Sequence, residues 1–591
     1  MVHGSSVLRA LIVLFGLGTV VISLLGPTAA SSSRTSADSD TVQRWRSPTA
    51  LWLAADGTLF AAGSKSGAVS VIDTENRELI AEVSLGKSLV ALAATPDGRT
   101  LIACDAAADE VLLIDRNGRH VRIRERVPVP TKPVDVIVDG DGRNCFVTSL
   151  WSRRVTRVDL STAKVAASID LDFDPRECIL LPDGQTLVVV DAFGGKLALI
   201  DTRSNQLIRR VEIPGHNMRG LALSPDGKDL LVTHMIVTES AATTRDNVFW
   251  GIAMTSNMRV IPIAALSDAG KNPVREAHTH FFGDPGNAAG DPDALAVLPD
   301  GTTLICLAGV GEVAIGRYYP YGFRRVSVGQ RPTALVVDEK QKFAYVANAH
   351  SDSITVVDIE RRSAAATISL GPGPVLSQVE EGERLFHDAK LSLDGWFSCH
   401  SCHTDGHSNG QRADTFGDGS YGAPKNVLTL LGTADTEPWA WNGSKKQLED
   451  QVRESLRMTM QPKVPPGEGT VAALTAYMRS LASAPIADWQ RRDAVAIERG
   501  ERIFNARGCA SCHAPPLYSN FHVYDVGLDD GEGGNRQFNP PSLRGLAHRA
   551  TYFHDGRAKS LEAVFRVHQH RLRTALSDDD LSDLIAFLKS L

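Results

Sequence analysis

The chain has 591 residues, of which 43% are hydrophobic and 22% charged, and its formal net charge is −7. At about 100 to 200 residues per domain, this length predicts several domains. The composition is ordinary for globular proteins, which excludes collagen-like repeats, general disorder and a multi-span membrane protein. The near-balanced charge gives no electrostatic reason to bind nucleic acid, so we expect no nucleic-acid partner. Eight cysteines are too few for a disulfide scaffold, and their spacing therefore carries more information than their number.

Residues 1–30 have the pattern of a secretory signal peptide. Arg9 precedes an apolar run from about residue 11 to residue 25, and the small residues Ala29 and Ala30 follow. The run is shorter than the ~20 residues of a spanning helix, which favours cleavage over an uncleaved membrane anchor. We therefore expect a periplasmic or otherwise exported protein without a stable membrane span. Residues 31–46, rich in Ser, Thr and Asp, are expected to form a flexible linker.

A repeat of about 42 residues fills residues 47–372. Asp-Gly turns recur at positions 56, 97, 141, 183, 226 and 300, followed by a degenerate Asp338-Glu339. Strand-like runs follow most of these turns, and the second run often ends in Ile-Asp or Val-Asp. A period in the low forties with about four strands per unit is typical of a propeller blade. The step of 74 residues between the turns at 226 and 300 equals one period plus an insertion, so seven blades are predicted.

The best-preserved unit resembles the YVTN-type β-propeller family. It begins at Pro332, contains the stretch Tyr345-Val346-Ala347-Asn348 and ends at Asp358. The resemblance implies a fold and leaves the activity open, because propellers host many functions.

Four cysteines and one insertion remain in this half. The cysteines lie in strand-like runs of different blades, and we expect buried free thiols rather than disulfides, although export permits disulfides. They are Cys104, Cys145, Cys178 and Cys306. The insertion, around residues 234–292, contains the alternating His278 and His280, which could ligate a metal or approach a cofactor of the other half. A solvated loop is the preferred interpretation of this segment.

The second half contains the motif Cys-x-x-Cys-His twice. The two copies are Cys399, Cys402 and His403, and Cys509, Cys512 and His513. Two cysteines three positions apart can each bond one vinyl group of a haem, and the following histidine can ligate the iron. Two copies in an exported chain favour haem over a zinc or dithiol site. Two covalently bound haem c groups are therefore predicted, with His403 and His513 as proximal ligands.

An internal duplication surrounds the two motifs. The stretch Gly382-Glu383-Arg384-Leu385-Phe386 matches residues 500–504, and residues 473–481 match residues 583–591. Leu474, Tyr477 and Met478 share one helical face, so each half is expected to close with an amphipathic helix. The predicted fold is an all-β seven-bladed propeller followed by two all-α cytochrome-c-like domains, at residues 373–485 and 486–591.

Residues 375–591 resemble the di-haem cytochrome c peroxidase family, which includes the methylamine-utilisation di-haem enzymes. The most specific stretch is Pro540-Pro541-Ser542-Leu543-Arg544, followed by Tyr552-Phe553-His554-Asp555-Gly556. In peroxidases of this family, a Met on the next helix is the second ligand of the electron-accepting C-terminal haem. Counting seven residues from Leu561 predicts His568 in that role here, with neighbouring His570 as the alternative. A His/His haem has a lower potential than a His/Met haem.

The resemblance also implies roles around the first haem. Trp441 corresponds to the family's tryptophan between the haems and is a candidate electron bridge, with a core tryptophan as the alternative. Gln451 corresponds to the distal glutamine. Where the family has an acid–base Glu, the sequence reads Met458-Thr459-Met460-Gln461, although cleavage of an O–O bond needs a group that moves a proton. The usual distal His is also absent, which leaves Met458, Met460 or an open sixth position as alternatives.

These features together predict an exported di-haem oxidoreductase of the cytochrome c peroxidase type. It would take electrons from a small soluble redox protein at the C-terminal haem and reduce peroxide or another small-molecule oxidant at the N-terminal haem. Two alternatives remain open. One is an electron-transfer cytochrome without peroxidase turnover, and the other is a propeller that binds a protein or substrate while the haems carry electrons away. The sequence leaves open whether calcium also binds.

Overall fold

The computed structural model describes residues 45–319, 322–373, 375–530 and 534–591. The predicted signal peptide and residues 31–44 of the predicted linker lie outside these ranges. Residues 43–591 cluster as one unit. Among the described residues, no helix combines the length and the apolar character that crossing a membrane requires.

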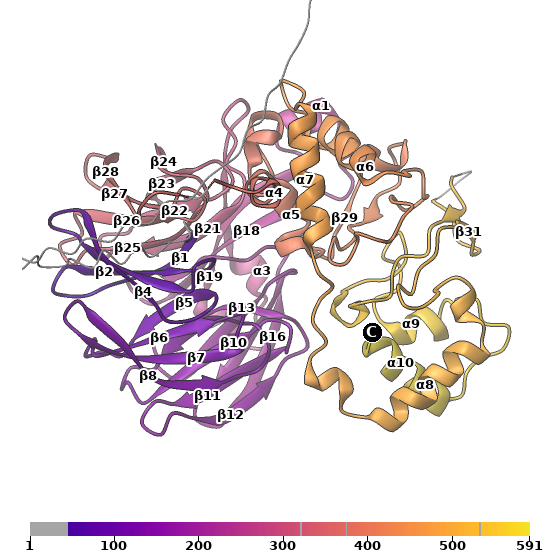
Figure 1. The fold of residues 1–591 in the computed structure, drawn as a ribbon, viewed down its shortest axis with the longest axis horizontal. Helices are drawn as coiled ribbons and strands as arrows, with labels where there is room; N and C mark the ends of the chain where they lie inside the picture. Colours follow the sequence, from indigo (N-terminus) through magenta and orange to yellow (C-terminus); the bar gives the residue numbers. More distant parts are fainter. Residues whose placement is uncertain (1–44, 320–321, 374, 531–533) are drawn as a thin grey trace, which may run out of the picture. The chain divides into compact units, whose positions relative to one another are not determined.

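Seven antiparallel four-stranded sheets follow one another along the N-terminal half (Figure 1), as the repeat predicts. The first four are β1–β4 (Pro48–Leu53, Thr58–Gly63, Ala68–Asp73, Glu78–Ser84), β5–β8 (Leu89–Ala94, Thr100–Asp105, Glu110–Asn117, His120–Pro128), β9–β12 (Pro133–Val138, Asn144–Ser149, Arg154–Asp159, Lys164–Asp170) and β13–β16 (Pro175–Leu180, Thr186–Asp191, Lys196–Asp201, Gln206–Glu212). The others are β17–β20 (Leu221–Leu223, Asp229–Val237, Met254–Pro262, His278–Phe282), β21–β24 (Pro292–Val297, Thr302–Leu307, Glu312–Arg317, Gly322–Ser327) and β25–β28 (Pro332–Val337, Phe343–Asn348, Ser353–Asp358, Ser363–Ser369).

The first strands of the blades form a closed ring. Each contacts the first strand of the next blade, and β25 returns to β1. The segment before β1 joins the last blade, because Trp45 Nε1 donates to the Ala349 carbonyl (3.1 Å) and the Ser47 amide donates to Asp352 Oδ1 (2.8 Å). The prediction of a seven-bladed propeller is therefore confirmed.

The predicted Asp-Gly turns connect the first and second strands of their blades. Their glycines have φ between 65° and 84°, a left-handed region that side chains disfavour. The degenerate unit places Gln341 in this region instead, with φ of 56°. The Asp-Gly turns that are recognised in the sequence therefore mark the ends of the first strands in the structure.

The propeller cysteines are buried free thiols, as predicted. Burial raises the pKa of Cys145 to about 12 and the pKa of Cys104 well above its usual value.

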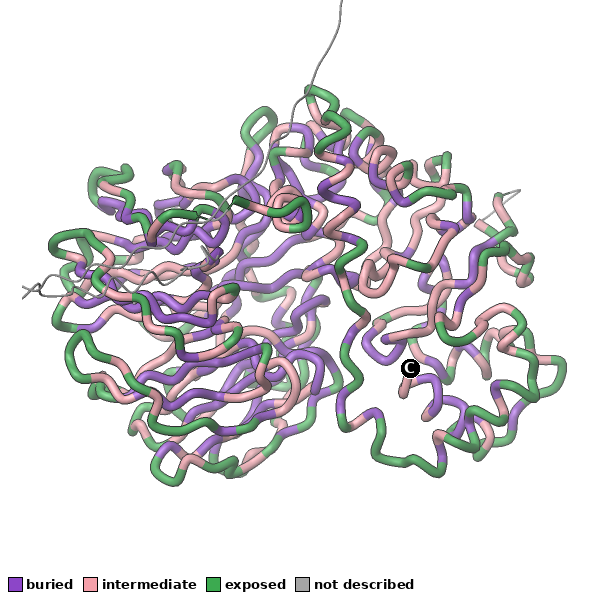
Figure 2. The backbone as a smooth tube through the Cα atoms, in the orientation of Figure 1, coloured by how far each residue is buried: buried purple, intermediate pink, exposed green. Residues whose placement is uncertain are grey.

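Figure 2 shows where exposed residues gather, at the turns and outer edges of the blades, with buried residues along the strands between them.

The insertion of the fifth blade is structured. Strands β18 and β19 are nine residues long, and the helices α1 (Arg245–Phe249), α2 (Ile263–Ser267) and α3 (Pro273–Glu276) accompany them. His278 and His280 belong to β20, the edge strand of this blade, which pairs with β19. The expectation of a solvated loop is therefore wrong for this segment, because β19 offers it a complete backbone partner.

Two helical domains follow the propeller. The first contains α4 (Gln378–Phe386), α5 (Cys399–Cys402), α6 (Leu448–Glu454), a π-helical segment (Ser455–Met460) and α7 (Glu468–Ser480), with short 3₁₀ turns at Ala389–Leu391, Leu393–Gly395, Thr404–Gly406 and Phe416–Asp418 and the ribbon β29 (Arg412–Ala413) and β30 (Lys425–Asn426). The second contains α8 (Ala494–Ala506), α9 (Leu561–Arg566) and α10 (Asp578–Lys589), with 3₁₀ turns at Asp488–Arg491, Cys509–Ser511 and Leu546–His548 and the ribbon β31 (Tyr524–Asp525) and β32 (Gln537–Phe538).

The duplicated glycines explain how the terminal helices pack in each domain. A Cβ atom on Gly382 of α4 would lie 2.0 Å from the Ala473 carbonyl of α7, and one on Gly500 of α8 would lie 2.0 Å from the Asp583 carbonyl of α10. Both positions therefore require glycine, because the backbones of the paired helices approach too closely for a side chain. The closing amphipathic helices that the sequence predicts are α7 and α10.

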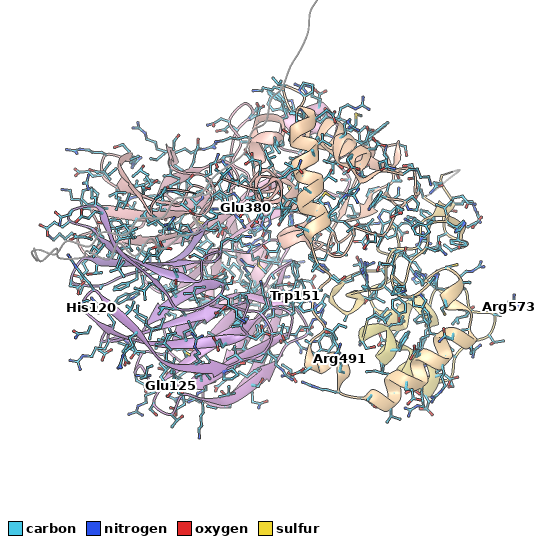
Figure 3. The ribbon with its side chains drawn as sticks, in the orientation of Figure 1. His120, Glu125, Trp151, Glu380, Arg491 and Arg573 are labelled. Atoms are coloured by element: carbon cyan, nitrogen blue, oxygen red, sulfur yellow. The ribbon has the colours of Figure 1, made fainter. Side chains whose placement is uncertain are left out.

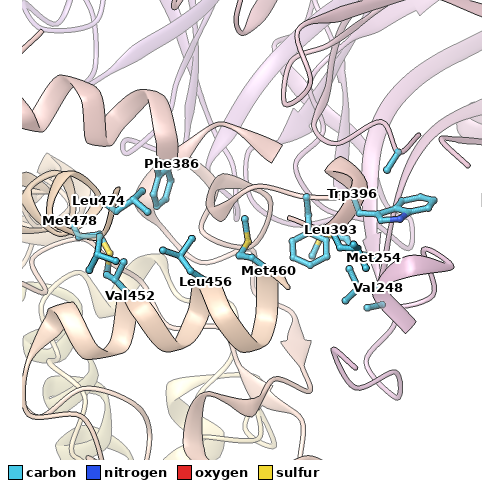
Figure 4. Close-up of a cluster of buried hydrophobic side chains, with 14 of the residues drawn as sticks. Val248, Met254, Phe386, Leu393, Trp396, Val452, Leu456, Met460, Leu474 and Met478 are labelled. Atoms are coloured by element: carbon cyan, nitrogen blue, oxygen red, sulfur yellow. The ribbon is translucent and has the colours of Figure 1, made fainter. Parts of the chain in front are cut away.

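The cores of the two domains are closed differently. Buried residues of the second domain form a core with one another, including Phe504, Leu584 and Leu588. The core of the first domain continues into the fifth-blade insertion of the propeller, where Val248 and Met254 join Leu456 and Met460 (Figure 4). The propeller thus completes the hydrophobic core of the first cytochrome domain.

Candidate haem sites

The two predicted proximal histidines are held in the same way. His403 Nδ1 donates to the Leu428 carbonyl (2.9 Å), and His513 Nδ1 donates to the Tyr518 carbonyl (3.2 Å). This bond fixes the tautomer and leaves Nε2 as the atom that can ligate iron. Burial lowers the pKa of His403 to about 4, and burial together with nearby His570 does the same for His513. Both rings are therefore neutral at pH 7, as metal ligation requires.

A cavity of about 650 Å³ lies beside the second motif and is lined by Cys509, Cys512 and His513. This volume is in the range of cofactor pockets. Arg549 also lines the cavity, and its buried Nε has no hydrogen-bond partner among the described residues. Burial lowers the pKa of Arg549 to about 10. A buried cation that lacks an anionic partner suits a haem propionate, so the residues fit a covalently bound haem.

The cavity also separates the two candidates for the distal ligand of the second haem. His570 lines it together with His513, and burial lowers the pKa of His570 to about 4. His568 packs its ring against Phe553 with centroids 5.4 Å apart, and in the described part of the chain it does not line the cavity. Helix α9 ends at Arg566, and Gln569 has φ of 44°, so helical counting does not hold beyond Arg566. The ligand assignment stays a prediction, for which His570 has the better placement.

Trp441, the candidate bridge, belongs to the first domain and lines the cavity of the second motif. Its Nε1 donates to the Asn426 carbonyl (2.9 Å), and the Asn539 amide donates to its carbonyl (2.8 Å). One hydrogen bond thus holds the indole within the first domain, and a second joins the Trp441 backbone to the second domain. The placement agrees with the bridging role, which stays a prediction.

Gln451 lies on α6 in the first domain. Its Nε2 donates to Ser455 Oγ (3.1 Å), while its buried Oε1 has no partner among the described residues. Met460 is buried in the core of the first domain, whereas Met458 is half-buried. The side-chain oxygen of Gln451 is therefore free to accept a hydrogen bond from a ligand.

The first attachment loop is bound by the propeller, which the sequence did not predict. Ser398 Oγ and Ser401 Oγ donate to the two carboxylate oxygens of Asp291, at 2.5 and 2.6 Å. His216 Nε2 donates to the Ser401 carbonyl (3.0 Å). All of these groups are buried, so one propeller carboxylate and one propeller imidazole hold the haem-binding loop.

Charged groups of the propeller also contact the chain just after the proximal His403. Arg176 Nη1 donates to Asp405 Oδ2 (2.7 Å), and Arg219 Nη2 donates to Asp405 Oδ1 (3.2 Å). Arg219 Nη2 also lies 3.2 Å from His400 Nε2. Both variable residues of the first motif, His400 and Ser401, therefore face propeller side chains.

The second attachment loop has a different environment. Ser511 is exposed, whereas Ser401, at the corresponding position, is fully buried. Asn520 Nδ2 donates to the Ser511 carbonyl (3.1 Å), and the neighbouring Phe521 is 59% exposed. The second loop thus faces solvent beside an exposed aromatic ring.

A third contact joins the propeller to both cytochrome domains. Trp151 of the propeller, labelled in Figure 3, meets His407 of the first domain and His548 of the second edge to face, with centroids 5.8 and 4.9 Å apart. His548 Nδ1 donates to the propeller's Asp174 (2.8 Å). Burial alone would raise the pKa of Asp174, but His548 and Arg153 outweigh it and lower this pKa to about 2. The ionised Asp174 therefore anchors the second domain to the propeller.

Oxygen atoms gather where the two cytochrome domains meet. The Asn426 side-chain amide contacts the carbonyls of Thr551 (3.2 Å) and Phe553 (3.5 Å), and its Oδ1 has no partner among the described residues. Amide and carbonyl oxygens are ligands that Ca²⁺ accepts. The sequence leaves calcium binding open, and these oxygens are a group that could take part in it.

Comparison with family models assigns both helical domains. Residues 377–485 match the model of the di-haem cytochrome c peroxidase family, and residues 497–591 match the cytochrome c model. The two matches contain both Cys-x-x-Cys-His motifs. They imply two c-type haems, one in each domain, as the sequence predicts.

Similar proteins include methylamine utilization protein MauG of Methylorubrum extorquens, 29% identical over 279 residues that cover 36% of this chain and 78% of the relative. Cytochrome c551 peroxidase of Nitrosomonas europaea is 24% identical over 265 residues, covering 36% of this chain and 79% of the relative. A solved structure of Kuenenia stuttgartiensis hydrazine synthase aligns with a TM-score of 0.47 and 21% identity, covering 56% of this chain and 99% of that one.

Proposed function

We propose a function from the premise that the C-terminal part of this chain belongs to the di-haem cytochrome c peroxidases. The protein is an exported oxidoreductase that takes electrons from a small soluble redox protein at its second haem site and reduces peroxide at its first. Export is proposed from the signal-peptide pattern of residues 1–30. The observation that carries the proposal is the different environment of the two attachment loops, one exposed and one covered by the propeller.

The exposed loop supports electron entry at the second site. Ser511 and Phe521 offer a small, partly apolar contact surface directly beside Cys509 and Cys512. A redox protein can dock there close to the cofactor. At the first site, Asp291 and His216 cover the corresponding loop, which favours a role with small molecules rather than with a protein partner.

Each haem would be held by the residues of its own motif. Cys399 and Cys402 would bond the first haem, with His403 as its proximal ligand. Cys509 and Cys512 would bond the second, with His513 as its proximal ligand and His570 as its second iron ligand. When bound, the haems would supply redox-active iron. The free Oε1 of Gln451 would accept a hydrogen bond from the peroxide and orient it.

The proposal is tested by peroxide-dependent oxidation of a reduced small cytochrome by the pure full-length protein. Turnover that falls about tenfold or more in Gln451→Ala supports peroxide reduction at the first site, since a tenfold loss corresponds to about 1.4 kcal/mol of transition-state stabilisation. A flat trace, with both haems six-coordinate by optical spectroscopy, would instead establish an electron-transfer cytochrome without turnover.

Trp441→Phe is expected to slow electron transfer between the two sites while both haems stay attached. The indole lines the cavity of the second motif and donates to the Asn426 carbonyl, whereas a phenyl ring is smaller, is harder to oxidise and cannot donate this bond. Stopped-flow spectroscopy after reduction of the second haem would measure the rate. An unchanged rate would leave Trp441 with a packing role only. Trp489→Phe is the control. Trp489 also donates one hydrogen bond to a backbone carbonyl, that of Trp151 in the propeller, but among the described residues it does not line the cavity of the second motif.

His570→Met is expected to raise the potential of the second haem, because thioether ligation favours reduced iron. His568→Met is the matched variant two residues away, and it should leave the potential unchanged. A redox titration followed optically measures both. If the His568 variant shifts the potential and the His570 variant does not, the distal ligand is His568, as counting along the helix predicts.

A further inference from the structure

A buried network of charges connects the propeller to the first haem-binding loop. Asp405 accepts hydrogen bonds from Arg176 (2.7 Å) and from Arg219 (3.2 Å). Arg176 lies in β13, the first strand of the fourth blade, and Arg219 lies just before β17, the first strand of the fifth. The side chain of Arg219 is only 4% exposed, and those of Arg176 and Asp405 are about one quarter exposed. The φ of Asp405 is 50°, so its backbone adopts a left-handed conformation that is uncommon for a non-glycine residue.

The network is rigidly joined to the attachment motif. The Asp405 amide donates to His400 Nδ1 (3.1 Å), and the Gly406 amide donates to the His403 carbonyl (2.9 Å). Asp405 is therefore two residues from the proximal ligand, on a turn that begins at that ligand. Its charge and the charges of the two arginines lie at short, fixed distances from the loop that carries the haem.

The charges do not cancel. Two guanidinium groups contact a single carboxylate, and Arg331 and Lys132 lie close enough to interact with Asp405 as well. The two guanidinium groups that contact the Asp405 carboxylate stabilise its ionised form. The nearby carboxyls of Asp135, Glu177 and Asp293 are buried, and burial raises the pKa of each. The network itself, with two guanidinium groups on one carboxylate, therefore carries one more cation than anions.

We propose that the propeller sets the reduction potential of the first haem through the network of Arg176, Arg219 and Asp405. Reduction removes one positive charge from the iron, so buried cations beside the loop favour the reduced state and a buried anion disfavours it. The low dielectric of a buried site preserves these interactions at distances where water would screen them. The propeller thus acts as an electrostatic part of the first redox centre. The proposal needs only the haem on Cys399 and Cys402, so it stands whether or not the protein turns over peroxide.

The test is an optical redox titration of the full-length protein with both haems attached. Arg219→Gln removes a cation and should lower the midpoint potential of the first haem. Asp405→Asn removes the anion and should raise the same midpoint. The double variant should fall between the two single variants. The first haem is identified as the one that remains when Cys509 and Cys512 are replaced by alanine.

Glu239→Gln is the matched control. Glu239 forms an ion pair with Arg412 across the same contact between the propeller and the first domain, but the two side chains are 46% and 35% exposed. Solvent screens such a pair, so both midpoints should stay unchanged. Arg176→Gln repeats the cation test at a second position if Arg219→Gln fails to fold. The proposal is overturned if removal of the cation and removal of the anion move the first midpoint in the same direction, or if neither moves it. A loss of thermal stability without shifts of opposite sign would identify these residues as structural only.

Discussion

Replacement of Cys399 and Cys402 by alanine is expected to reduce the covalent haem content from two groups per chain to one and to abolish peroxide reduction. Each motif supplies the two thiols that bond one haem, and the second motif lies in a separate domain with its own core, beside a cavity that it lines. Haem content per chain by the pyridine haemochrome assay, together with the mass of the intact chain, measures the loss.

The control for this experiment is Cys306→Ala, which removes a buried thiol of the propeller. This variant should keep two haems, because Cys306 lies in a strand of the sixth blade, apart from both motifs. A stoichiometry of two in the variant without Cys399 and Cys402 would contradict the assignment of the first haem site. Peroxide reduction that survives with one haem would move the reaction to the second site.

Asp291→Ala is expected to destabilise the holoprotein by about 3 kcal/mol. The substitution leaves the buried hydroxyls of Ser398 and Ser401 without their acceptor, and each unsatisfied buried group costs about 1–3 kcal/mol. The loop that bears the first haem would lose its main hold on the propeller, so the absorbance of that haem should change with the stability. Denaturant unfolding of the holoprotein, followed at a haem wavelength, measures the effect.

A double-mutant cycle isolates this contact. The pair Ser398→Ala and Ser401→Ala leaves the Asp291 carboxylate buried without those donors, and it should destabilise the protein by a similar amount. The triple variant should be more stable than the sum of these losses predicts, because removing both sides of a buried hydrogen bond costs less than removing one. Strictly additive losses would show that Asp291 does not act through the two serines.

The propeller contributes to both haem sites, but in different ways. It covers the first attachment loop, completes the core of the first domain through Val248 and Met254, and brings two arginines to Asp405. At the second domain it contributes Asp174, which holds His548, and leaves the attachment loop exposed. The propeller thus covers one attachment loop and leaves the other exposed, and the proposed division of roles between the two sites rests on this difference.

Features that depend on local patterns can be predicted from the amino-acid sequence alone. The turn glycines adopt a left-handed backbone wherever they occur. Because these turns recur about every 42 residues, the sequence indicates that one structural unit, the four-stranded blade, is repeated. Covalent haem attachment needs cysteines three positions apart, so Cys399 and Cys402 and their second copy are recognisable without a fold. Gly382 and Gly500 stand at the same place in each repeat because the paired helices touch there.

Features that depend on residues far apart in the chain, or on where a helix ends, become visible only in the folded protein. Asp291 and Arg219 precede the first motif by more than one hundred residues, and no local pattern marks either as a partner of the haem-binding loop. Counting along a helix predicted His568, but α9 ends at Arg566 and the backbone then turns, which brings His570 to the cavity. Side-chain direction follows the helical period only while the backbone hydrogen bonds of the helix continue.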